Sequence, residues 1–316
     1  MLTKKSKVGI PSRSFCKSKL LRSSLEKHFD NVNYNEELRH FNEKEFIDYF
    51  HDCEALIVSE DPISKNVIDS LPNLKILSKF GVGLDSIDTD YLKEKNIRLG
   101  WSPGVNAAAV AQLSLSYLIL MLREAYTLNR RLLSHEWAKV SNSRDLSSIS
   151  IGIVGFGNVG KKLASYLKIF DLNILIYDPL FKEGEILDGK VKSVSFTDIL
   201  KLSDAISVHV PLTSDTKDLF GKRELFMMKP RSVLINLSRG GVVNESALLE
   251  ALNEGHLNGA ASDVFEEEPQ NTDYFSSQLL NCKNFFSTPH IAGTTNQTIQ
   301  RLGEVAIESL MEHYQI

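Results

Sequence analysis

The sequence predicts an α/β protein built from two doubly wound domains, each with a parallel sheet covered by helices. Short β-rich segments alternate with helical patterns along the whole chain, which is typical of parallel sheets with helices on both faces. Several of these segments are apolar almost throughout, as expected for strands that are covered on both faces. The length of 316 residues favours two domains over one.

The predicted strands are separated, in most cases, by helical patterns. They are expected at residues 8–10, 55–58, 74–78, 97–99, 151–154, 174–177, 205–208, 233–236 and 259–263. A breaker cluster at 101–104 ends the first alternating block, and a long helical pattern follows at 106–122. A second break at Thr288-Pro289 precedes a last helix at 295–314. The second block therefore lies between two helices that can cross between domains, and we expect a ligand site in the cleft between the domains.

Composition and charge argue against several classes of function. The formal net charge of −4 leaves no basic surplus to attract nucleic acid or anionic lipid. Cys16, Cys53 and Cys282 are odd in number and far apart, so they predict neither a disulfide framework nor a metal site, and they fit a reducing cytoplasm. The longest apolar run, at 113–122, is interrupted by polar residues and indicates a buried helix. No signal peptide is expected at the basic N-terminus.

A glycine-rich turn predicts a dinucleotide site. The strand at 151–154 runs into Gly155-Phe156-Gly157-Asn158-Val159-Gly160, and a helical pattern follows. The first glycine permits the tight turn, the second lets the backbone approach a pyrophosphate, and the third lets the helix pack closely on the strand. The helix N-terminus then offers N–H groups and the positive end of its dipole. The alternative is a turn that uses glycine for its geometry alone.

An acidic residue at the end of the next strand predicts NAD rather than NADP. Asp178 follows the strand at 174–177, and its carboxylate can accept hydrogen bonds from the ribose hydroxyls of NAD. The same charge would repel the 2′-phosphate of NADP, and residues 179–181 contain no arginine to receive that phosphate. The alternative is that Asp178 only caps the end of the strand.

Three polar segments in the last third of the chain could together form a site for hydride transfer. Arg239 follows the strand at 233–236, where parallel sheets bind ligands, and its guanidinium suits a carboxylate or an α-keto acid. His290 stands at a rigid break and has the near-neutral pKa that a proton donor needs. Glu268 is the natural partner to orient the imidazole and raise its pKa. Each residue also has a structural explanation, as a turn, a satisfied histidine or a solvated acidic loop.

These motifs together resemble the D-isomer-specific 2-hydroxyacid dehydrogenase family, which includes phosphoglycerate, glyoxylate/hydroxypyruvate and D-lactate dehydrogenases. The resemblance covers most of the chain, from about Ala55 to His290. The matching segments are residues 79–88 (KFGVGLDSID), the glycine turn with 177–179 (YDP), 209–213 (HVPLT), 236–243 (NLSRGGVV), 262–265 (SDVF) with 268–269 (EP), and 288–291 (TPHI).

The resemblance implies a flavodoxin-like substrate domain at 1–101 with 290–316, and a Rossmann NAD-binding domain at 102–289. It implies a homodimer built around the helix at 106–122. Arg239 would bind the carboxylate and keto oxygen of the substrate, with His290 as the acid/base and Glu268 as its partner. Cofactor contacts are expected at Gly155, Gly157, Asn158, Val159, Gly160, Asp178, Val210, Pro211, Thr216, Ser238 and Asp263, and substrate contacts at Ser59, Lys79, Phe80, Gly81 and Val82.

Some positions depart from the family pattern. Ser59 stands where phosphoglycerate dehydrogenases have an arginine for the substrate phosphate, which argues against 3-phosphoglycerate. Gln112 and Asn244 replace acidic residues and look peripheral to the chemistry, whereas Trp101 is expected to reshape the cleft. Lys79 is expected either to meet a second acidic group on the substrate or, as the favoured interpretation, to be a solvated lysine.

The leading hypothesis is a cytoplasmic NAD-dependent oxidoreductase that interconverts a small 2-keto acid and its D-2-hydroxy acid, without metal. Two alternatives stay open. The family also resembles corepressors that bind NAD as sensors, although nothing basic or repetitive here suggests a partner platform. Phosphite dehydrogenases share the arginine, glutamate and histidine set. Formate dehydrogenases of this fold usually carry glutamine where Glu268 stands, which argues against that activity.

Overall fold

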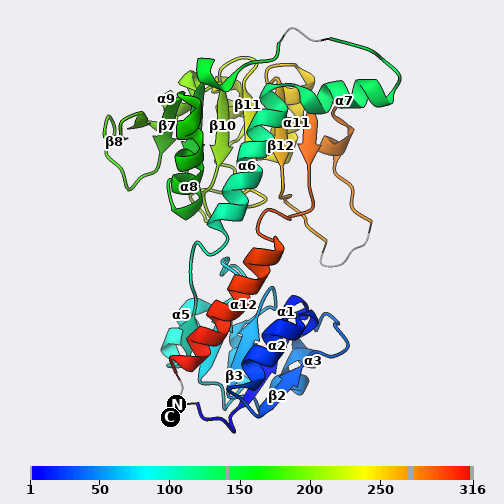
Figure 1. Cartoon of the computed structure of the whole chain (residues 1–316), viewed down its shortest axis with the longest axis vertical. Helices are drawn as coiled ribbons and strands as arrows, with labels where there is room; N and C mark the ends of the chain where they lie inside the picture. Colours follow the sequence, from blue (N-terminus) through cyan, green and yellow to red (C-terminus); the bar gives the residue numbers. More distant parts are fainter. Residues whose placement is uncertain (1, 140–141, 270–273, 314–316) are drawn as a thin grey trace. The chain divides into compact units, whose positions relative to one another are not determined.

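The computed structural model describes residues 2–139, 142–269 and 274–313 and divides into two compact units (Figure 1). Unit 1 comprises Met1–Asn106 and Thr294–Ile316, and unit 2 comprises Ala107–Gly293. Residues 102–106 thus belong to unit 1 and residues 290–293 to unit 2. Residues 290–292 belong to unit 2 because their backbone N–H groups donate hydrogen bonds to Asp263, which lies inside that unit.

Unit 1 is a five-stranded, wholly parallel sheet in the order β2-β1-β3-β4-β5, the flavodoxin-like order. Its elements are β1 (Lys7–Ile10), α1 (Arg13–Lys17), α2 (Lys19–Glu26), β2 (Asn31–Tyr34), α3 (Glu43–Phe50), β3 (Ala55–Val58), α4 (Lys65–Asp69), β4 (Ile76–Lys79), α5 (Thr89–Glu94), β5 (Arg98–Gly100) and α12 (Asn296–Met311). The last helix therefore returns to the first unit, as a discontinuous domain requires.

The side chains of β3 show why the first sheet is covered on both faces. Ala55 and Ile57 pack into the core formed with α1, α2 and α12. Leu56 and Val58 point the other way, into the core formed with α3, α4 and α5. Successive residues of a strand face opposite sides of the sheet, so a strand that is apolar throughout supplies both cores.

Unit 2 is an eight-stranded sheet in the order β13-β12-β11-β10-β6-β7-β9-β8, and only β8 pairs antiparallel. The central order is that of a Rossmann domain, reversing between β6 and β10. Its elements are α6 (Ala107–Leu122), α7 (Ala125–Leu133), β6 (Ser150–Val154), α8 (Asn158–Leu167), β7 (Asn173–Tyr177), β8 (Ile186–Asp188), β9 (Val191–Ser193), α9 (Phe196–Leu202), β10 (Ala205–Val208), α10 (Lys222–Met227), β11 (Val233–Asn236), α11 (Glu245–Asn253), β12 (Gly259–Ser262) and β13 (Phe285–Ser287).

Helices cover both faces of the second sheet as well. On one face, α6 and α8 pack over Ile151, Ile153 and Ile235. On the other face, α9, α10 and α11 pack over Val154, Val208 and neighbouring strand residues. Within the described residues, no single helix is long and apolar enough to cross a bilayer. The two helices α6 and α7 reach that length and composition only as a pair, which is bent by 65° at its break.

Candidate active site

The glycine turn lies directly after β6, where the strand order of unit 2 reverses. Gly155 has a φ of +93°, in the region that favours glycine, and its N–H donates to the carbonyl of Tyr177 at 2.9 Å. A Cβ atom on Gly155 would lie 2.5 Å from the carbonyl oxygen of His209 on the far side of the reversal. Backbone from both sides of the reversal therefore meets here, and only glycine fits.

The other two glycines of the turn have different surroundings. A Cβ atom on Gly160 would lie 2.2 Å from the carbonyl oxygen of Gly155, so α8 packs against the turn more closely than any other residue would allow. A Cβ atom on Gly157 would meet nothing within 4 Å among the described atoms. Gly157 is the N-cap of α8 and supplies no side-chain cap to its first N–H groups. The first turn of α8, at Asn158 and Val159, thus leaves the open, N–H-rich cradle that a pyrophosphate needs.

Asp178 follows β7 and braces the glycine turn. Its Oδ2 accepts the N–H of Phe156 at 2.8 Å, and its Oδ1 accepts the N–H of Leu180 at 3.0 Å. The capping alternative raised by the sequence is therefore present in the structure. A carboxylate oxygen can accept more than one hydrogen bond, so this bracing leaves capacity for a ribose hydroxyl.

The segment after β10 is bent back by its own hydrogen bonds. The hydroxyl of Thr216 donates to the carbonyl of Pro211 at 2.6 Å and accepts the N–H of Thr213 at 2.8 Å. His209, just before Val210, is a half-buried residue whose surroundings the sequence does not predict. Its Nε2 lies 2.9 Å from Ser207 Oγ, and burial lowers its pKa to about 3, so this ring stays neutral.

Asp263 follows β12 and organises the backbone around His290. Its side chain is 1% exposed, and it accepts the N–H groups of Ile291 at 2.9 Å and Ala292 at 2.7 Å, together with the hydroxyl of Thr288. The carbonyl of Asp263 also accepts the N–H of His290 at 2.8 Å. Burial raises the pKa of this carboxyl, against the lowering effect of those donors. These contacts hold His290 at a φ of +52°, a conformation that non-glycine residues rarely adopt.

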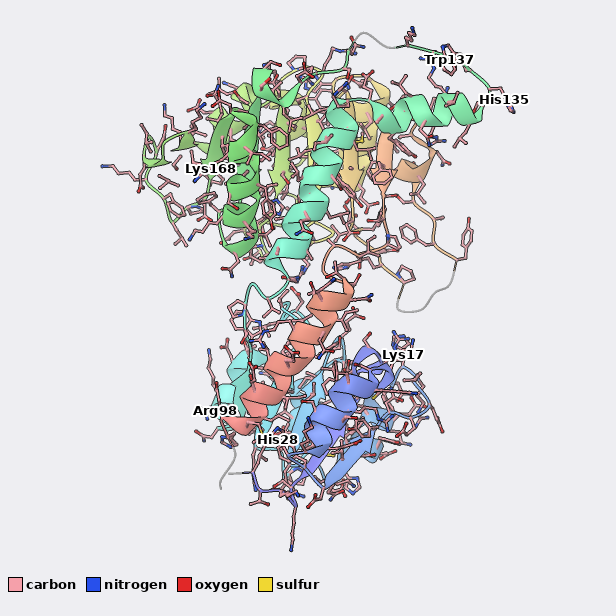
Figure 2. All side chains as sticks on the ribbon, viewed as in Figure 1. Lys17, His28, Arg98, His135, Trp137 and Lys168 are labelled. Atoms are coloured by element: carbon pink, nitrogen blue, oxygen red, sulfur yellow. The ribbon has the colours of Figure 1, made fainter. Side chains whose placement is uncertain are left out.

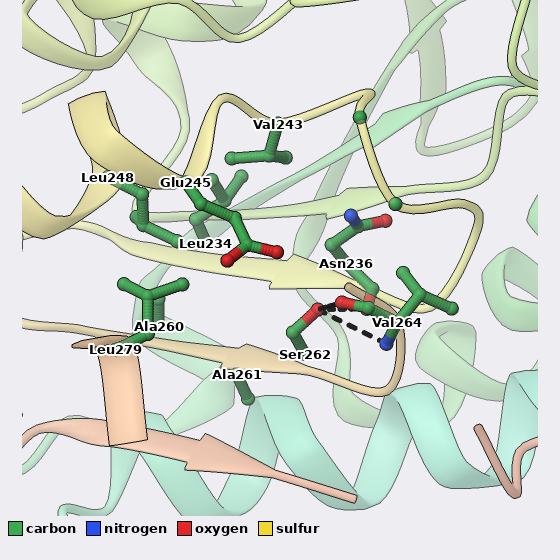
Figure 3. A pocket seen from close by; sticks show the side chains of 12 residues that line it. Leu234, Asn236, Val243, Glu245, Leu248, Ala260, Ala261, Ser262, Val264 and Leu279 are labelled. Carbon is green, nitrogen blue, oxygen red and sulfur yellow. Dashed lines mark hydrogen bonds between the residues drawn. The ribbon is translucent and has the colours of Figure 1, made fainter. Parts of the chain in front are cut away.

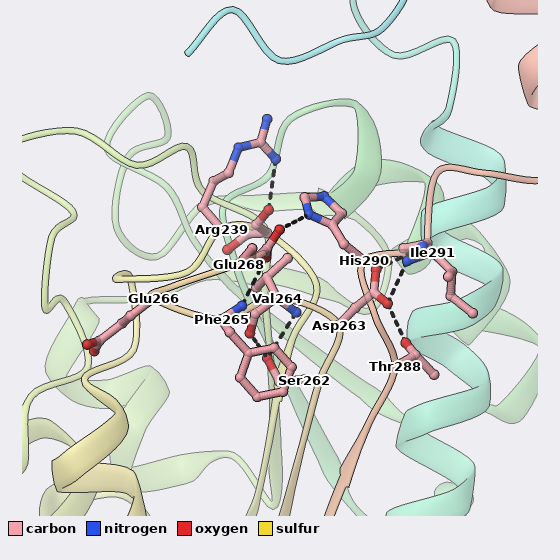
Figure 4. Close-up of polar contacts among 12 residues, drawn as sticks. Arg239, Ser262, Asp263, Val264, Phe265, Glu266, Glu268, Thr288, His290 and Ile291 are labelled. Atoms are coloured by element: carbon pink, nitrogen blue, oxygen red, sulfur yellow. Dashed lines mark hydrogen bonds and ion pairs between the residues drawn. The ribbon is translucent and has the colours of Figure 1, made fainter. Parts of the chain in front are cut away.

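Glu268 and His290 meet directly, as their residue types predicted (Figure 4). Glu268 Oε2 lies 2.6 Å from His290 Nδ1, and Glu268 Oε1 accepts the N–H of Phe265 at 3.0 Å. The hydrogen bond that His290 donates to Glu268 raises the pKa of His290, in opposition to burial. Burial works to raise the pKa of Glu268, but its hydrogen bond with His290 and the nearby positive charges outweigh it and lower that pKa. The imidazole keeps 47% of its surface exposed and is open to a reactant.

Arg239 lies on the loop after β11, beside the glutamate and histidine (Figure 4). Its Nη1 donates to the carbonyl of Ser238 at 2.8 Å, and Ser238 in turn is held by Asn236 Oδ1. The charge of Arg239 contributes to the lowered pKa of Glu268 and partly opposes the rise in the pKa of His290. Arg239, Glu268 and His290 are far apart in sequence, but their side chains lie close enough for their charges to affect one another's pKa.

The expected substrate contacts lie in unit 1, at the ends of β3 and β4. Ser59 and the run Lys79, Phe80, Gly81 and Val82 occupy these positions. The favoured interpretation of Lys79 as a solvated lysine is wrong, because its side chain is only 7% exposed. Its ammonium donates to the carbonyl of Ser59, so a strand-end carbonyl replaces water around the charge.

Two further features of the site could not be found from residue types. One is the pair of reciprocal hydrogen bonds between Glu245, at the start of α11, and Glu266, in the acidic loop. The hydroxyl of Thr288 links Asp263 to Tyr117 on α6, and the Tyr117 contact is 2.5 Å long. Neither residue pair has a sequence signal of its own. Across the described residues, no group of three or more histidine, cysteine or acidic side chains is arranged to hold a metal ion.

Comparisons with known proteins identify the family and the fold. Residues 115–292 match the family model for the D-isomer specific 2-hydroxyacid dehydrogenase, NAD binding domain. A glyoxylate reductase of Thermococcus litoralis is 36% identical over 259 residues, covering 79% of this chain and 77% of that protein. A hydroxypyruvate reductase of Thermotoga maritima is 32% identical over 275 residues, covering 86% and 89%. The crystal structure of a glyoxylate reductase from Paecilomyes thermophila superimposes with a TM-score of 0.84 at 25% identity, covering 98% and 95%.

The fold and the glycine turn define an NAD-binding α/β oxidoreductase. The chain belongs to the D-isomer specific 2-hydroxyacid dehydrogenase family. Its activity is accordingly that of an NAD-dependent 2-hydroxyacid dehydrogenase.

Proposed function

We propose that this enzyme reversibly reduces a small 2-keto acid of the glyoxylate or hydroxypyruvate type to the D-2-hydroxy acid, with His290 as acid/base. The observation that carries the proposal is the 2.6 Å contact between Glu268 and His290, close to the positive charge of Arg239. The names of the relatives support the substrate class, since they include glyoxylate and hydroxypyruvate reductases.

His290 is proposed to move the proton. Bound NADH supplies the hydride that the reduction needs, and the oxygen of the former carbonyl must then gain a proton. Glu268 holds Nδ1, so Nε2 is the ring nitrogen available to donate that proton. In the direction of oxidation, neutral His290 takes the hydroxyl proton at the same nitrogen. Positioned proton transfer of this kind contributes roughly 10²- to 10⁴-fold to a rate.

Arg239 is proposed to bind the carboxylate and the keto oxygen of the substrate. Its planar guanidinium offers several donors at once, and its positive charge stabilises the negative charge that develops on the oxygen. One of its nitrogens is held by the carbonyl of Ser238, which limits the orientations of the fork. The substrate carboxylate is also proposed to meet N–H groups in the run Phe80, Gly81 and Val82, with Ser59 and Lys79 as neighbours.

The cofactor is proposed to lie along the ends of the central strands of unit 2. The pyrophosphate would rest on the turn from Gly155 to Gly160, and the ribose hydroxyls on Asp178. Val210, Pro211, Thr216, Ser238 and Asp263 are proposed to line the remainder of the dinucleotide. Asp263 contributes chiefly by shaping the backbone around His290, since its carboxylate is already occupied by donors of residues 288, 291 and 292.

A homodimer is also proposed, with the surface of α6 and α7 as its interface. Leu132, Leu133 and Trp137 are 51%, 73% and 82% exposed. The two leucines end α7, and Trp137 lies just beyond it (Figure 2). Large apolar side chains that gather on one surface commonly mark an interaction site.

A cytoplasmic location is proposed because Cys16, Cys53 and Cys282 are all unpaired thiols, which suits a reducing compartment.

The test is a steady-state screen of purified enzyme against a panel of 2-keto acids, with NADH and NADPH in parallel. The proposal expects turnover of a small 2-keto acid with NADH. Where the product has a stereocentre, as with hydroxypyruvate, the D configuration is expected, whereas glyoxylate gives achiral glycolate. Binding of NADH without turnover of any 2-keto acid would favour a sensor of NAD instead. Phosphite-dependent reduction of NAD, with no turnover of 2-hydroxy acids, would favour the other alternative.

A further inference from the structure

Two glutamates outside the Arg239, Glu268 and His290 set bind each other's backbone. The N–H of Glu245 donates to Glu266 Oε1 at 3.0 Å, and the N–H of Glu266 donates to Glu245 Oε1 at 2.7 Å. The hydroxyl of Ser277 donates to the second oxygen of Glu245 at 3.2 Å. This reciprocal pair ties the loop that carries Glu268 to the start of α11.

The position of Glu245 explains why the pair forms. Glu245 is the first residue of α11, after the N-cap Asn244, and its N–H is one of those that have no partner inside the helix. The carboxylate of Glu266 accepts this N–H at the positive end of the helix dipole, where a negative charge is favoured. Glu245 also lines a small pocket with Asn236 and Ser262, at the ends of β11 and β12 (Figure 3).

One peptide group connects the Glu245–Glu266 pair to both loops of the proposed site, the loop of Arg239 and the loop of Glu268. The N–H of the peptide between Phe265 and Glu266 is the group that Glu245 accepts. The carbonyl of the same peptide faces Gly240, where a Cβ atom would lie only 1.8 Å from the Phe265 oxygen. Gly240 directly follows Arg239. The orientation of this peptide therefore sets the separation between the Arg239 loop and the Glu268 loop.

Phe265 links this peptide to the side chain of Glu268. Its N–H donates to Glu268 Oε1, which leaves Oε2 for His290. Its ring is buried and packs on Phe275 and Phe285, with ring centroids 4.7 and 6.3 Å away. The ring anchors one side of the loop to the core, and Glu245 anchors the next peptide by a hydrogen bond.

We propose that Glu245 is a positioning residue for the reaction, acting through Glu268. It holds the peptide between Phe265 and Glu266, and this peptide keeps Glu268 within hydrogen-bond distance of His290 and close to the Arg239 loop. The inference rests on the proposed roles of Glu268 and His290. It assigns a task to a side chain that touches none of the reacting groups.

The first experiment compares three substitutions of Glu245 by steady-state kinetics of 2-keto acid reduction across pH. Glu245→Ala removes the acceptor, and Glu245→Asp keeps the charge but shortens the reach by one methylene. Both are expected to lower kcat by roughly 10- to 10²-fold, the cost of a small misplacement of reacting groups. Glu245→Gln keeps an oxygen for the Glu266 N–H and is expected to stay near the parent rate. Glu267→Ala, an exposed acid in the same loop, is the matched control and should change nothing.

The pH profile separates positioning from a general structural role. When Glu268 is displaced, His290 loses the contact that raises its pKa, so the falling limb of reduction is expected at lower pH in Glu245→Ala and Glu245→Asp. Urea unfolding of each variant shows which rates belong to a folded enzyme. If Glu245→Ala does not fold, the proposal is tested by comparing the rates of Glu245→Asp and Glu245→Gln, of which only Glu245→Asp should be slow. Parent rates and profiles in Glu245→Asp would overturn the proposal.

A double substitution tests whether Glu245 acts through Glu268. Glu268→Gln combined with Glu245→Ala is expected to be no slower than Glu268→Gln alone, because the interaction is already lost. If the double variant loses as much additional kcat as Glu245→Ala loses alone, Glu245 does not act through Glu268 and the proposal is overturned. His290→Ala separates the two levels of inference. Parent activity in His290→Ala refutes the proposed function, whereas loss there with parent behaviour in the Glu245 variants refutes only this inference.

Discussion

Glu268 Oε2 and His290 Nδ1 lie 2.6 Å apart although 22 residues separate them in sequence. The contact forms because β12 and β13 are neighbouring parallel strands whose carboxyl ends lead into the two loops. It leaves Nε2 of His290 as the nitrogen that can exchange a proton with a substrate. Because Glu268 raises the pKa of His290, the imidazole stays protonated to higher pH than that of an isolated histidine.

The first prediction concerns the pH dependence of Glu268→Gln. If His290 is the proton donor, as proposed, reduction requires its protonated form, so the kcat/KM of reduction is expected to be level below the pKa of His290 and to fall above it. Replacing the carboxylate with a neutral amide removes the charge that raises this pKa, and the falling limb should move to lower pH. Oxidation requires neutral His290 and should show the opposite, rising limb. Profiles of both directions check this, and an unmoved limb in Glu268→Gln would contradict it.

The second prediction concerns the choice of cofactor at Asp178. In Asp178→Asn, an amide oxygen remains to brace the Phe156 N–H, but the negative charge is gone. Discrimination against NADPH is expected to fall by roughly 10- to 10²-fold, the value of about 1.5–3 kcal/mol for a hydrogen bond to a charged group. The ratio of kcat/KM values for NADH and NADPH measures it. An unchanged ratio would mean that Asp178 serves only to brace the turn.

The third prediction compares two glycines of one turn. Gly160→Ala places a Cβ atom 2.2 Å from the Gly155 carbonyl oxygen and should lower the free energy of unfolding by about 1–3 kcal/mol. Gly157→Ala meets nothing within 4 Å of the described atoms and should cost less than about 1 kcal/mol, while still weakening NADH binding. Urea unfolding and NADH fluorescence titration report the two effects separately. Equal losses of stability in both variants would contradict this account.

The fourth prediction concerns the proposed dimer. Leu133→Asp puts a charge on the exposed apolar surface at the end of α7 and should convert the dimer into a monomer. Leu202→Asp, on the 53% exposed Leu202 of α9, is the matched control and should remain dimeric. Light scattering after size exclusion gives both masses. A parent protein that is monomeric at micromolar concentration, or a dimer that tolerates Leu133→Asp, would refute the proposed interface.

The buried strands were predictable because burial on both faces makes them apolar throughout. The predicted strands at 55–58, 205–208 and 233–236 coincide with β3, β10 and β11. Edge strands carry less signal. β2, with the sequence Asn-Val-Asn-Tyr, was missed because only one neighbour and one partly exposed face define it. The three-residue strands β8, β9 and β13 were also missed, whereas β5, of the same length, was predicted at 97–99.

Two local features of the candidate site were predictable from residue type. They are the positive φ of Gly155 and the contact between Glu268 and His290. The catalytic roles of these residues stay predictions. Lys79 was misread, since burial of a lysine depends on a carbonyl that only the folded chain brings to it. Glu245 was invisible for the same reason, because its partner is a backbone N–H with no sequence signature.

The central claim is that His290 is the acid/base of a 2-keto acid reductase. The most direct measurement is kcat/KM for NADH-dependent reduction of the best 2-keto acid by the parent enzyme and by His290→Ala, with NADH affinity measured alongside. The account predicts a loss of roughly 10²- to 10⁴-fold with NADH binding intact. A His290→Ala enzyme that binds NADH and turns over at the parent rate would contradict it.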